Sequence, residues 1–259
     1  MLRTRSYRES DRLCTLLTRT CGVINAYARG ARNLKNKNFA STNQLSYARF
    51  TLFSGKDGSY SINDTHLEHI FVPVLADLDR LSLAQYLCEL AEEMTPPDKH
   101  SEAYLMLMLR ALNTLSKRDR SVPLIKAATE LRMLSVSGFM PDLVMCSECG
   151  EYEADLMHFM PRTGTIRCGS CGPDGPSVPL SRGALTAMRH CCYTDMNQTF
   201  SFSLAESSLE QFSQACERYM TERLERTFTT LDFYRSLMSG AMPGTQPQET
   251  SENQPKPKE

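Results

Sequence analysis

The stretch Cys146-Ser-Glu-Cys149, followed after eighteen residues by Cys168-Gly-Ser-Cys171, contains two Cys-x-x-Cys knuckles. Knuckles at this separation are typical of a structural zinc site. A two-residue gap lets both thiolates of one knuckle reach the same ion at about 2.3 Å, and two knuckles complete a tetrahedron. Because all four positions are cysteine, no coordination position is left for a substrate or an activated water. We therefore predict a structural Zn²⁺ ion bound by Cys146, Cys149, Cys168 and Cys171.

The cysteines allow two other interpretations. The four residues could be buried thiols or disulfides, although two knuckles rarely occur at this distance by chance. A zinc deaminase carries His-x-Glu followed by Pro-Cys-x-x-Cys, and His66-Leu-Glu68 is present here. However, Met145 stands where that signature has proline, and two further cysteines would close the site. The deaminase match is therefore a coincidence.

Length and composition place the chain among folded proteins of a reducing compartment. The 259 residues can form one large domain or two to three small ones. No apolar run approaches the roughly 18 residues of a membrane span, and the first residues lack the apolar segment of a secretory signal. Ten cysteines without such a signal favour a reducing environment, so we expect a cytoplasmic protein with no membrane partner.

Charge is distributed unevenly along the chain. Residues 1–49 contain ten Lys or Arg and two acids, a net charge of +8, whereas the remaining residues carry a net charge of −9. A basic segment on an otherwise acidic chain is a candidate surface for a polyanion such as DNA. The alternative is an ordinary solvated face, and the charge alone does not decide between them.

The first 72 residues are predicted to form a small β-domain. Alternating β-branched and aromatic residues indicate strands at 21–28 and 45–54, with further short pairings at 60–63 and 66–71. Residues 13–20 are interpreted as a helix or turn. The segment 29–38 between the first two strands is a basic, glycine-containing loop, which suits contact with a phosphate backbone.

Helical periodicity dominates after Pro73, apart from the cysteine segment. Apolar residues at three- and four-residue steps predict helices at 74–94, 101–115, 123–137, 181–193, 204–224 and 231–238. Two short strands at 157–160 and 165–167 are predicted between the knuckles. The resulting organisation is a helical domain in two parts (73–144 and 179–240), a zinc module at 145–178 inserted between them, and a disordered tail at 241–259.

No catalytic motif is present in the sequence. It contains no phosphate-binding loop, no Gly-x-Ser-x-Gly elbow and no dinucleotide fingerprint. This favours a binding protein over an enzyme.

Several motifs in a fixed order resemble the bacterial RecO family of recombination and DNA-repair mediators. Its opening signature is similar to Tyr7-Arg-Glu-Ser-Asp-Arg12 with Thr18 and Gly22, and its basic turn to Ala28-Arg-Gly-Ala-Arg32. The approach to the cysteines is similar to Glu130–Leu134 with Gly138–Leu143, and the closing segment to Leu224–Leu231. The four cysteines match the zinc-bearing members.

This resemblance implies an α+β, multi-domain architecture: an N-terminal OB-fold β-barrel at 1–72 and an α-helical domain with an inserted four-cysteine zinc module. It implies a non-enzymatic mediator, associated with the nucleoid, that binds single- and double-stranded DNA and anneals complementary strands. Such a mediator assists recombinase loading on DNA coated by single-strand-binding protein. Its partners are a RecR-like protein and the C-terminal tail of single-strand-binding protein.

Specific residues follow for these contacts. For DNA we assign Arg29, Arg32, Lys35 and Lys37, with Arg3, Arg5, Arg8, Arg12 and Arg49 as further candidates. For the tail peptide, Lys126 and Arg132 are candidates, because a peptide carboxylate needs a cation beside an apolar groove. The alternative function is a zinc-ribbon transcription or adaptor factor, in which residues 145–178 alone make the contact. A hydrolytic zinc enzyme is a third, weaker alternative.

Overall fold

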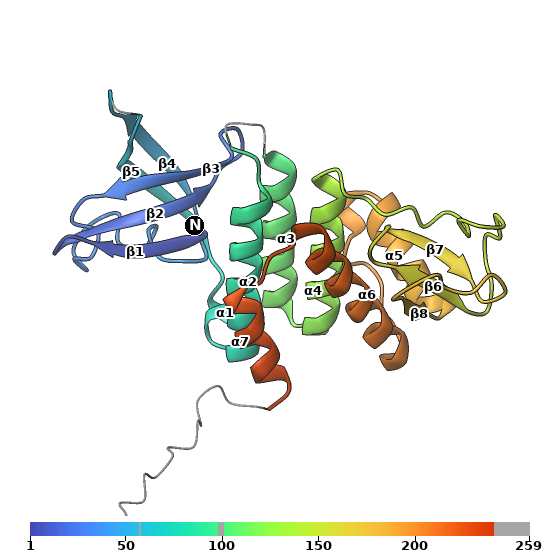
Figure 1. The fold of residues 1–259 in the computed structure, drawn as a ribbon. Helices are drawn as coiled ribbons and strands as arrows, with labels where there is room; N and C mark the ends of the chain where they lie inside the picture. The colour runs from blue at the N-terminus through green and yellow to red at the C-terminus, as the bar shows by residue number, and fades with distance from the viewer. Residues whose placement is uncertain (57, 98–100, 241–259) are drawn as a thin grey trace, which may run out of the picture.

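The computed structural model describes residues 1–56, 58–97 and 101–240. The chain forms an elongated molecule, with an N-terminal β-sheet at one end, a group of helices in the middle and a small second sheet at the other end (Figure 1). The α+β architecture predicted from the sequence is therefore confirmed. The tail predicted to be disordered, 241–259, lies outside the described residues.

The N-terminal sheet has five strands in the order β1-β2-β3-β5-β4. All neighbours are antiparallel except β3 and β5, which are parallel. One face of β2 and β3 carries small apolar side chains, among them Cys14, Ala26 and Ala28, which are fully buried in a core of their own. The strands are β1 (Arg3–Tyr7), β2 (Asp11–Leu17), β3 (Val23–Ala28), β4 (Ser46–Ser54) and β5 (Tyr60–Ile70).

The sheet has the strand order of an OB-fold but is not closed as a barrel, so the prediction of a β-barrel was wrong in this respect. In the described part of the chain no strand pairing joins β1 to β4. Instead, the segment before β4 follows the free edge of β1. Leu45 donates its backbone N–H to the carbonyl of Met1 at 3.0 Å, and the Gln44 side chain donates to the carbonyl of Leu2 at 2.9 Å. Turns and side-chain contacts thus cover an edge that would otherwise be open.

Two local predictions in this domain were also wrong. Residues 13–20, interpreted as a helix or turn, contain most of strand β2. Cys14 through Leu17 are all buried, because Cys14 and Leu16 lie in the core of the sheet and Leu17 packs against the helices. The two-residue alternation of a half-exposed strand is therefore absent. The two short pairings expected at 60–63 and 66–71 form one continuous strand, β5.

The helices lie close to their predicted positions. They are α1 (Val72–Leu75), α2 (Leu78–Met94), α3 (Glu102–Lys117), α4 (Val122–Val136), α5 (Arg182–Tyr193), α6 (Glu206–Leu224) and α7 (Thr229–Met238), with a 3₁₀ turn at Met196–Gln198. The single helix expected at 74–94 is interrupted, because Asp77 caps a new helix by accepting from the Arg80 N–H at 3.2 Å. The second sheet has the order β7-β6-β8, with β6 (Met157–Met160), β7 (Thr165–Cys168) and β8 (Val178–Leu180).

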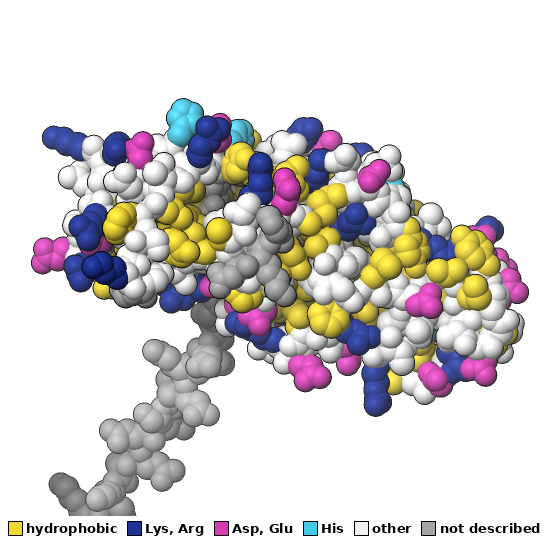
Figure 2. All heavy atoms as spheres, turned by 90° about the horizontal axis from the view of Figure 1, so that it is seen from above, with side chains coloured by type: hydrophobic (Ala, Val, Ile, Leu, Met, Phe, Trp, Pro, Cys, Tyr) yellow, Lys and Arg dark blue, Asp and Glu magenta, His cyan; other side chains and the backbone are white. Residues whose placement is uncertain are grey.

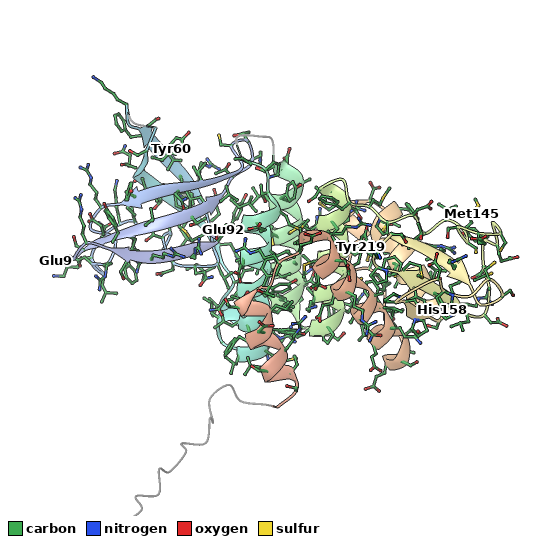
Figure 3. The ribbon with its side chains drawn as sticks, in the orientation of Figure 1. Glu9, Tyr60, Glu92, Met145, His158 and Tyr219 are labelled. Carbon is green, nitrogen blue, oxygen red and sulfur yellow. The ribbon has the colours of Figure 1, made fainter. Side chains whose placement is uncertain are left out.

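Polar contacts join the N-terminal sheet to the helices. The Ser101 side chain, just before α3, donates to the carbonyl of Thr18 at 2.6 Å and accepts from the Gly22 N–H at 3.1 Å. Arg3 of β1 forms an ion pair with Glu92 of α2, and Figure 3 shows Glu92 where the helices meet the sheet. The sheet and α3 also border a largely apolar cavity of about 620 Å³.

Candidate metal centre and nucleic-acid surface

The two Cys-x-x-Cys knuckles meet at one point beside the second sheet. The four Sγ atoms of Cys146, Cys149, Cys168 and Cys171 all lie within 4.8 Å of one another. The Cys149 and Cys168 sulfurs are 3.6 Å apart. Four sulfurs at about 2.3 Å from a tetrahedral Zn²⁺ are separated by roughly 3.8 Å, so the observed spacing suits such an ion.

The two knuckles have the same backbone turn. Gly150 donates its N–H to the carbonyl of Cys146, and Gly172 donates to the carbonyl of Cys168, both at 3.0 Å. Both glycines have positive φ angles, 77° and 67°, which side chains other than glycine rarely adopt. The glycine after each knuckle therefore allows the chain to fold back under the cluster.

The electrostatics of the cluster also fit a cation. Burial opposes ionisation of Cys146, but backbone N–H donors, including that of Cys168 at 3.3 Å, lower its pKa to about 6. In contrast, hydrogen bonds with the neighbouring thiols of Cys149 and Cys168 raise the pKa of Cys171 to about 12. Four thiolates this close together would repel one another, and a positive ion between them would offset that repulsion.

The cysteine module is packed firmly onto the helical domain. Phe159 of β6 contacts Tyr219 of α6 edge-to-face, with ring centroids 5.4 Å apart, and both side chains are buried. Arg189 of α5 donates to the carbonyls of Val144 at 2.9 Å and Tyr152 at 2.7 Å, on either side of the first knuckle. The module and the helices share one hydrophobic core. A metal ion here would hold together part of the domain core.

A second candidate site lies at the opposite end of the molecule, at the tip of the N-terminal sheet. The β1–β2 turn and the loop after β3 are joined there: Gly30 donates its N–H to the Asp11 carboxylate at 2.8 Å, and Arg32 donates its backbone N–H to Ser10 at 2.9 Å. Figure 3 shows Glu9 at this tip, and Figure 2 shows several Lys and Arg side chains gathered at this end of the molecule. We call residues 5–12 and 29–37 the basic tip.

The nine cations predicted to contact DNA differ in their environments. Three form ion pairs: Arg3 with Glu92, Lys37 with Asp64 at 2.6 Å, and Arg49 with Glu68 at 3.1 Å. Arg12 is turned inward, where its guanidinium binds Phe39, Thr42 and Asn43 and holds the loop in place. Among the described residues the others have no carboxylate partner; they are Arg5, Arg8, Arg29, Arg32 and Lys35.

An aromatic pair accompanies these cations and was not singled out from the sequence. The rings of Tyr7 and Tyr27 lie with centroids 4.9 Å apart, and the Arg8 guanidinium lies 5.3 Å from the Tyr7 centroid. The two tyrosines are twenty residues apart, and only the pairing of β1 and β3 with β2 brings them together. Their separation in the chain is the reason that sequence patterns did not identify them.

The two cations predicted to bind a peptide carboxylate are engaged inside the helical domain. The Lys126 side chain is 4% exposed and forms ion pairs with Glu130 and Glu217, at 2.8 and 2.6 Å. The ammonium group of Lys126 is therefore not exposed to a peptide, and this environment argues against the assignment. Arg132 is half-buried and donates from Nη1 to the last carbonyls of α5, at 2.9 Å to Cys191.

The general class is an α+β protein suited to binding a polyanion. It is defined by an OB-like sheet with a basic tip and by a helical domain with a four-thiol cluster. None of the described helices is both long and apolar enough to cross a membrane. Comparison with known proteins narrows the class. The family described as "Recombination protein O N terminal" matches residues 1–71, and "Recombination protein O C terminal" matches residues 75–232.

Relatives of similar length agree with these matches. The chain is 34% identical over 230 residues to the DNA repair protein RecO of Acetivibrio thermocellus, covering 88% of this chain and 91% of the relative. It is 30% identical over 243 residues to the DNA repair protein RecO of Symbiobacterium thermophilum, covering 92% and 96%. A further relative, from Alkaliphilus metalliredigens, is 29% identical over 239 residues. The chain belongs to the RecO family.

Proposed function

We propose that the protein acts in DNA repair and recombination by binding single- and double-stranded DNA at the basic tip and annealing complementary strands. The observation that carries this proposal is the group of five cations at the tip that have no carboxylate partner among the described residues, on a sheet with OB-fold strand order. In the relatives, the name "DNA repair protein" points to the same role. The protein has no enzymatic activity in this proposal.

The basic tip suits annealing for an electrostatic reason. Two strands repel each other through their phosphates, and a surface that neutralises both lowers the repulsion. Arg29, Arg32 and Lys35 lie on a loop of turns, so they can follow a phosphate backbone without demanding a base sequence. Lys37 and Arg49 would first have to leave Asp64 and Glu68, so we assign them a smaller share of the binding.

The cysteine module has a different part in this function. Residues 145–178 contain five acids and two arginines, which disfavours DNA as the ligand of the module. When bound, Zn²⁺ would cross-link the two knuckles through the four cysteine sulfurs. The chain's own residues, Phe159 and Arg189, transmit this order to α6 and α5. The domain boundaries expected from the sequence are retained here, with 145–178 as the structural module.

The remaining partners also belong to this proposal. A mediator of this family would help a recombinase to load where single-strand-binding protein coats the DNA, together with a RecR-like protein, in the cytoplasm at the nucleoid. For the C-terminal tail of single-strand-binding protein, Arg132 stays a candidate contact. Lys126 does not, since it is buried.

The test is annealing of complementary oligonucleotides coated with single-strand-binding protein, across a salt series. The variant is Arg29→Ala/Arg32→Ala/Lys35→Ala. Each lost phosphate contact reduces the slope of log affinity against log salt by about 0.7 for single strands, so three contacts reduce it by about 2. We expect annealing to fall together with this slope.

A charge-matched control distinguishes a local site from net charge. The variant Arg182→Ala/Arg218→Ala/Arg226→Ala removes three exposed cations outside the basic tip, from α5, α6 and the segment that follows α6. Arg182 and Arg226 form ion pairs with Glu153 and Glu93. It should keep the wild-type slope and annealing rate. Equal losses in both triple variants would contradict the placement of DNA at the basic tip, and no annealing by folded wild type would contradict the function.

A further inference from the structure

We propose that Tyr7 and Tyr27 form a stacking platform for unpaired bases, which makes the outer face of β1–β3 selective for single-stranded DNA. This inference rests on the proposed function and adds to it the form of nucleic acid that the site prefers. It is carried by the placement of the two rings, their exposure and the charges around them.

The strand register places both rings on the outer face of the sheet. Arg5 and Tyr27 lie on either side of Leu13, and Tyr7 lies beside Asp11, one step along the same face. The opposite face of β2 and β3 carries the buried core side chains described above. Since successive side chains of a strand point to opposite faces, the tyrosines cannot belong to that core.

The two rings are accessible and lack internal polar partners. Tyr7 is 36% exposed and Tyr27 is half-buried. In the described part of the chain neither phenol oxygen has a hydrogen-bond partner, whereas buried tyrosines usually have one. The ring planes are inclined by 48° at a centroid distance of 4.9 Å, so the two rings form one continuous aromatic surface, with the Arg8 guanidinium 5.3 Å from the Tyr7 centroid. An aromatic pair at the surface of a sheet is a surface on which bases can stack.

Cations lie where the phosphates of a stacked strand would run. Arg5 shares the outer face with the rings, Arg8 lies over Tyr7 at 5.3 Å, and Arg29 follows the end of β3. The neighbouring acid, Asp11, already accepts the Gly30 N–H at 2.8 Å. Residues 5–12 and 29–37 together contain seven Lys or Arg and two acids, Glu9 and Asp11, so the local balance remains positive.

The rings and the cations of this site would contact different parts of the DNA. The bases of a duplex are stacked inside the helix and cannot lie on a tyrosine, so only unpaired bases gain from the rings. The cations act on the phosphates of either form. Single strands would therefore bind more tightly than duplex, and pairing of two strands would remove the bases from the rings and favour release of the product.

The experiment compares Tyr7→Leu/Tyr27→Leu with wild type, using a labelled single-stranded oligonucleotide and the duplex of the same sequence. Loss of stacking should lower single-strand affinity by about five-fold or more for each base that no longer stacks, while duplex affinity changes by less than about two-fold. The variant Tyr7→Phe/Tyr27→Phe keeps the rings and should bind as the wild type does. The matched control is Tyr152→Leu, which removes an exposed tyrosine that also lies against an arginine, Arg189 at 4.2 Å, but in the cysteine module.

A spectroscopic readout is available because the chain has ten tyrosines and no tryptophan. Binding of single strands should quench tyrosine fluorescence in wild type and less so in the double Leu variant. Unchanged single-strand affinity in a folded double Leu variant, with loss in the Arg29/Arg32/Lys35 variant, would overturn the platform and leave the DNA function intact. Equal losses for single strand and duplex would also overturn it. If the double variant does not fold, Tyr7→Leu alone provides the same comparison.

Discussion

The buried ion pair at the centre of the helical domain offers a quantitative prediction. Lys126 and Glu130 lie one turn apart on α4, with side chains 4% and 0% exposed and charged atoms 2.8 Å apart. Tyr86 of α2 donates to the same carboxylate at 2.6 Å, and Glu217 of α6 accepts from Lys126 at 2.6 Å. The perturbation is Lys126→Met, which keeps the length of the side chain and removes its charge.

The expected cost follows from what remains after the change. At neutral pH the fully buried Glu130 carboxylate would keep the Tyr86 hydroxyl as its one remaining partner among the described residues. Loss of one member of a buried pair costs about 3–5 kcal/mol. Glu217 is 29% exposed and retains Arg235 at 2.7 Å, so it adds at most about 1 kcal/mol. We predict that Lys126→Met lowers the free energy of unfolding by about 3–5 kcal/mol at pH 7.

The assay is urea unfolding followed by far-UV circular dichroism, with Lys126→Met/Glu130→Gln as the second variant. The double variant also removes the buried, unpaired charge of Glu130 and should recover most of the lost stability. Burial raises the pKa of Glu130, so in the single variant the deficit should be largest at neutral pH and shrink as the pH falls toward the ordinary glutamate value of about 4.3. A deficit that is unchanged by Glu130→Gln and by pH would show that packing, not charge, is responsible, and would refute the reasoning.

Three further predictions concern other parts of the molecule. Removing the metal with a chelator, or changing Cys168 to Ala, should lower the thermal midpoint and the yield of folded protein before DNA binding is affected, since structural zinc contributes directly to folding; a metal-free variant that melts like wild type would contradict this. Gly164→Ala should lower the free energy of unfolding by more than about 1 kcal/mol, since φ is 72° and the new Cβ would lie 2.7 Å from the Tyr219 hydroxyl. The control Gly175→Ala, at a position with open space around it, should leave the thermal midpoint unchanged. Burial works against the charge of Glu217, yet the ammonium group of Lys126 and the guanidinium group of Arg235 hold its pKa below the ordinary value. The contribution of Glu217 to stability is therefore present above about pH 4.3 and is lost as the pH falls further. Glu217→Gln should make the thermal midpoint less dependent on pH in the acid range, and an unchanged pH dependence would count against this contribution.

The clustering of the four cysteines could be predicted from the sequence because the information for it is local. Two cysteines separated by two residues can point their sulfurs to the same place, and the glycine after each knuckle permits the turn. The structure brings the four sulfurs together as the spacing requires. Helix positions were likewise predictable, since an apolar stripe of period 3.6 identifies a helix without knowledge of its neighbours.

Strands were harder to predict because their patterns depend on what covers each face. Strand β2 is buried on both faces over Cys14–Leu17, and this removed the alternation that would have identified it. The open edge between β1 and β4 depends on the loop that lies along it, through contacts such as that of Gln44 with Leu2. No local pattern encodes such a contact between distant residues.

The sequence by itself determined the helical and β regions, the four cysteines that come together and the excess of positive charge in the first 49 residues. Only the tertiary structure decided which of those charges are available. Lys126 looks in sequence like any other lysine, but the packing of α2, α4 and α6 buries it against two carboxylates. In contrast, the pairing of β1, β2 and β3 brings Tyr7 and Tyr27 together at the surface. A side chain's type is written in the sequence, whereas its solvation and its partners depend on residues far away in the chain, and these set its electrostatic role.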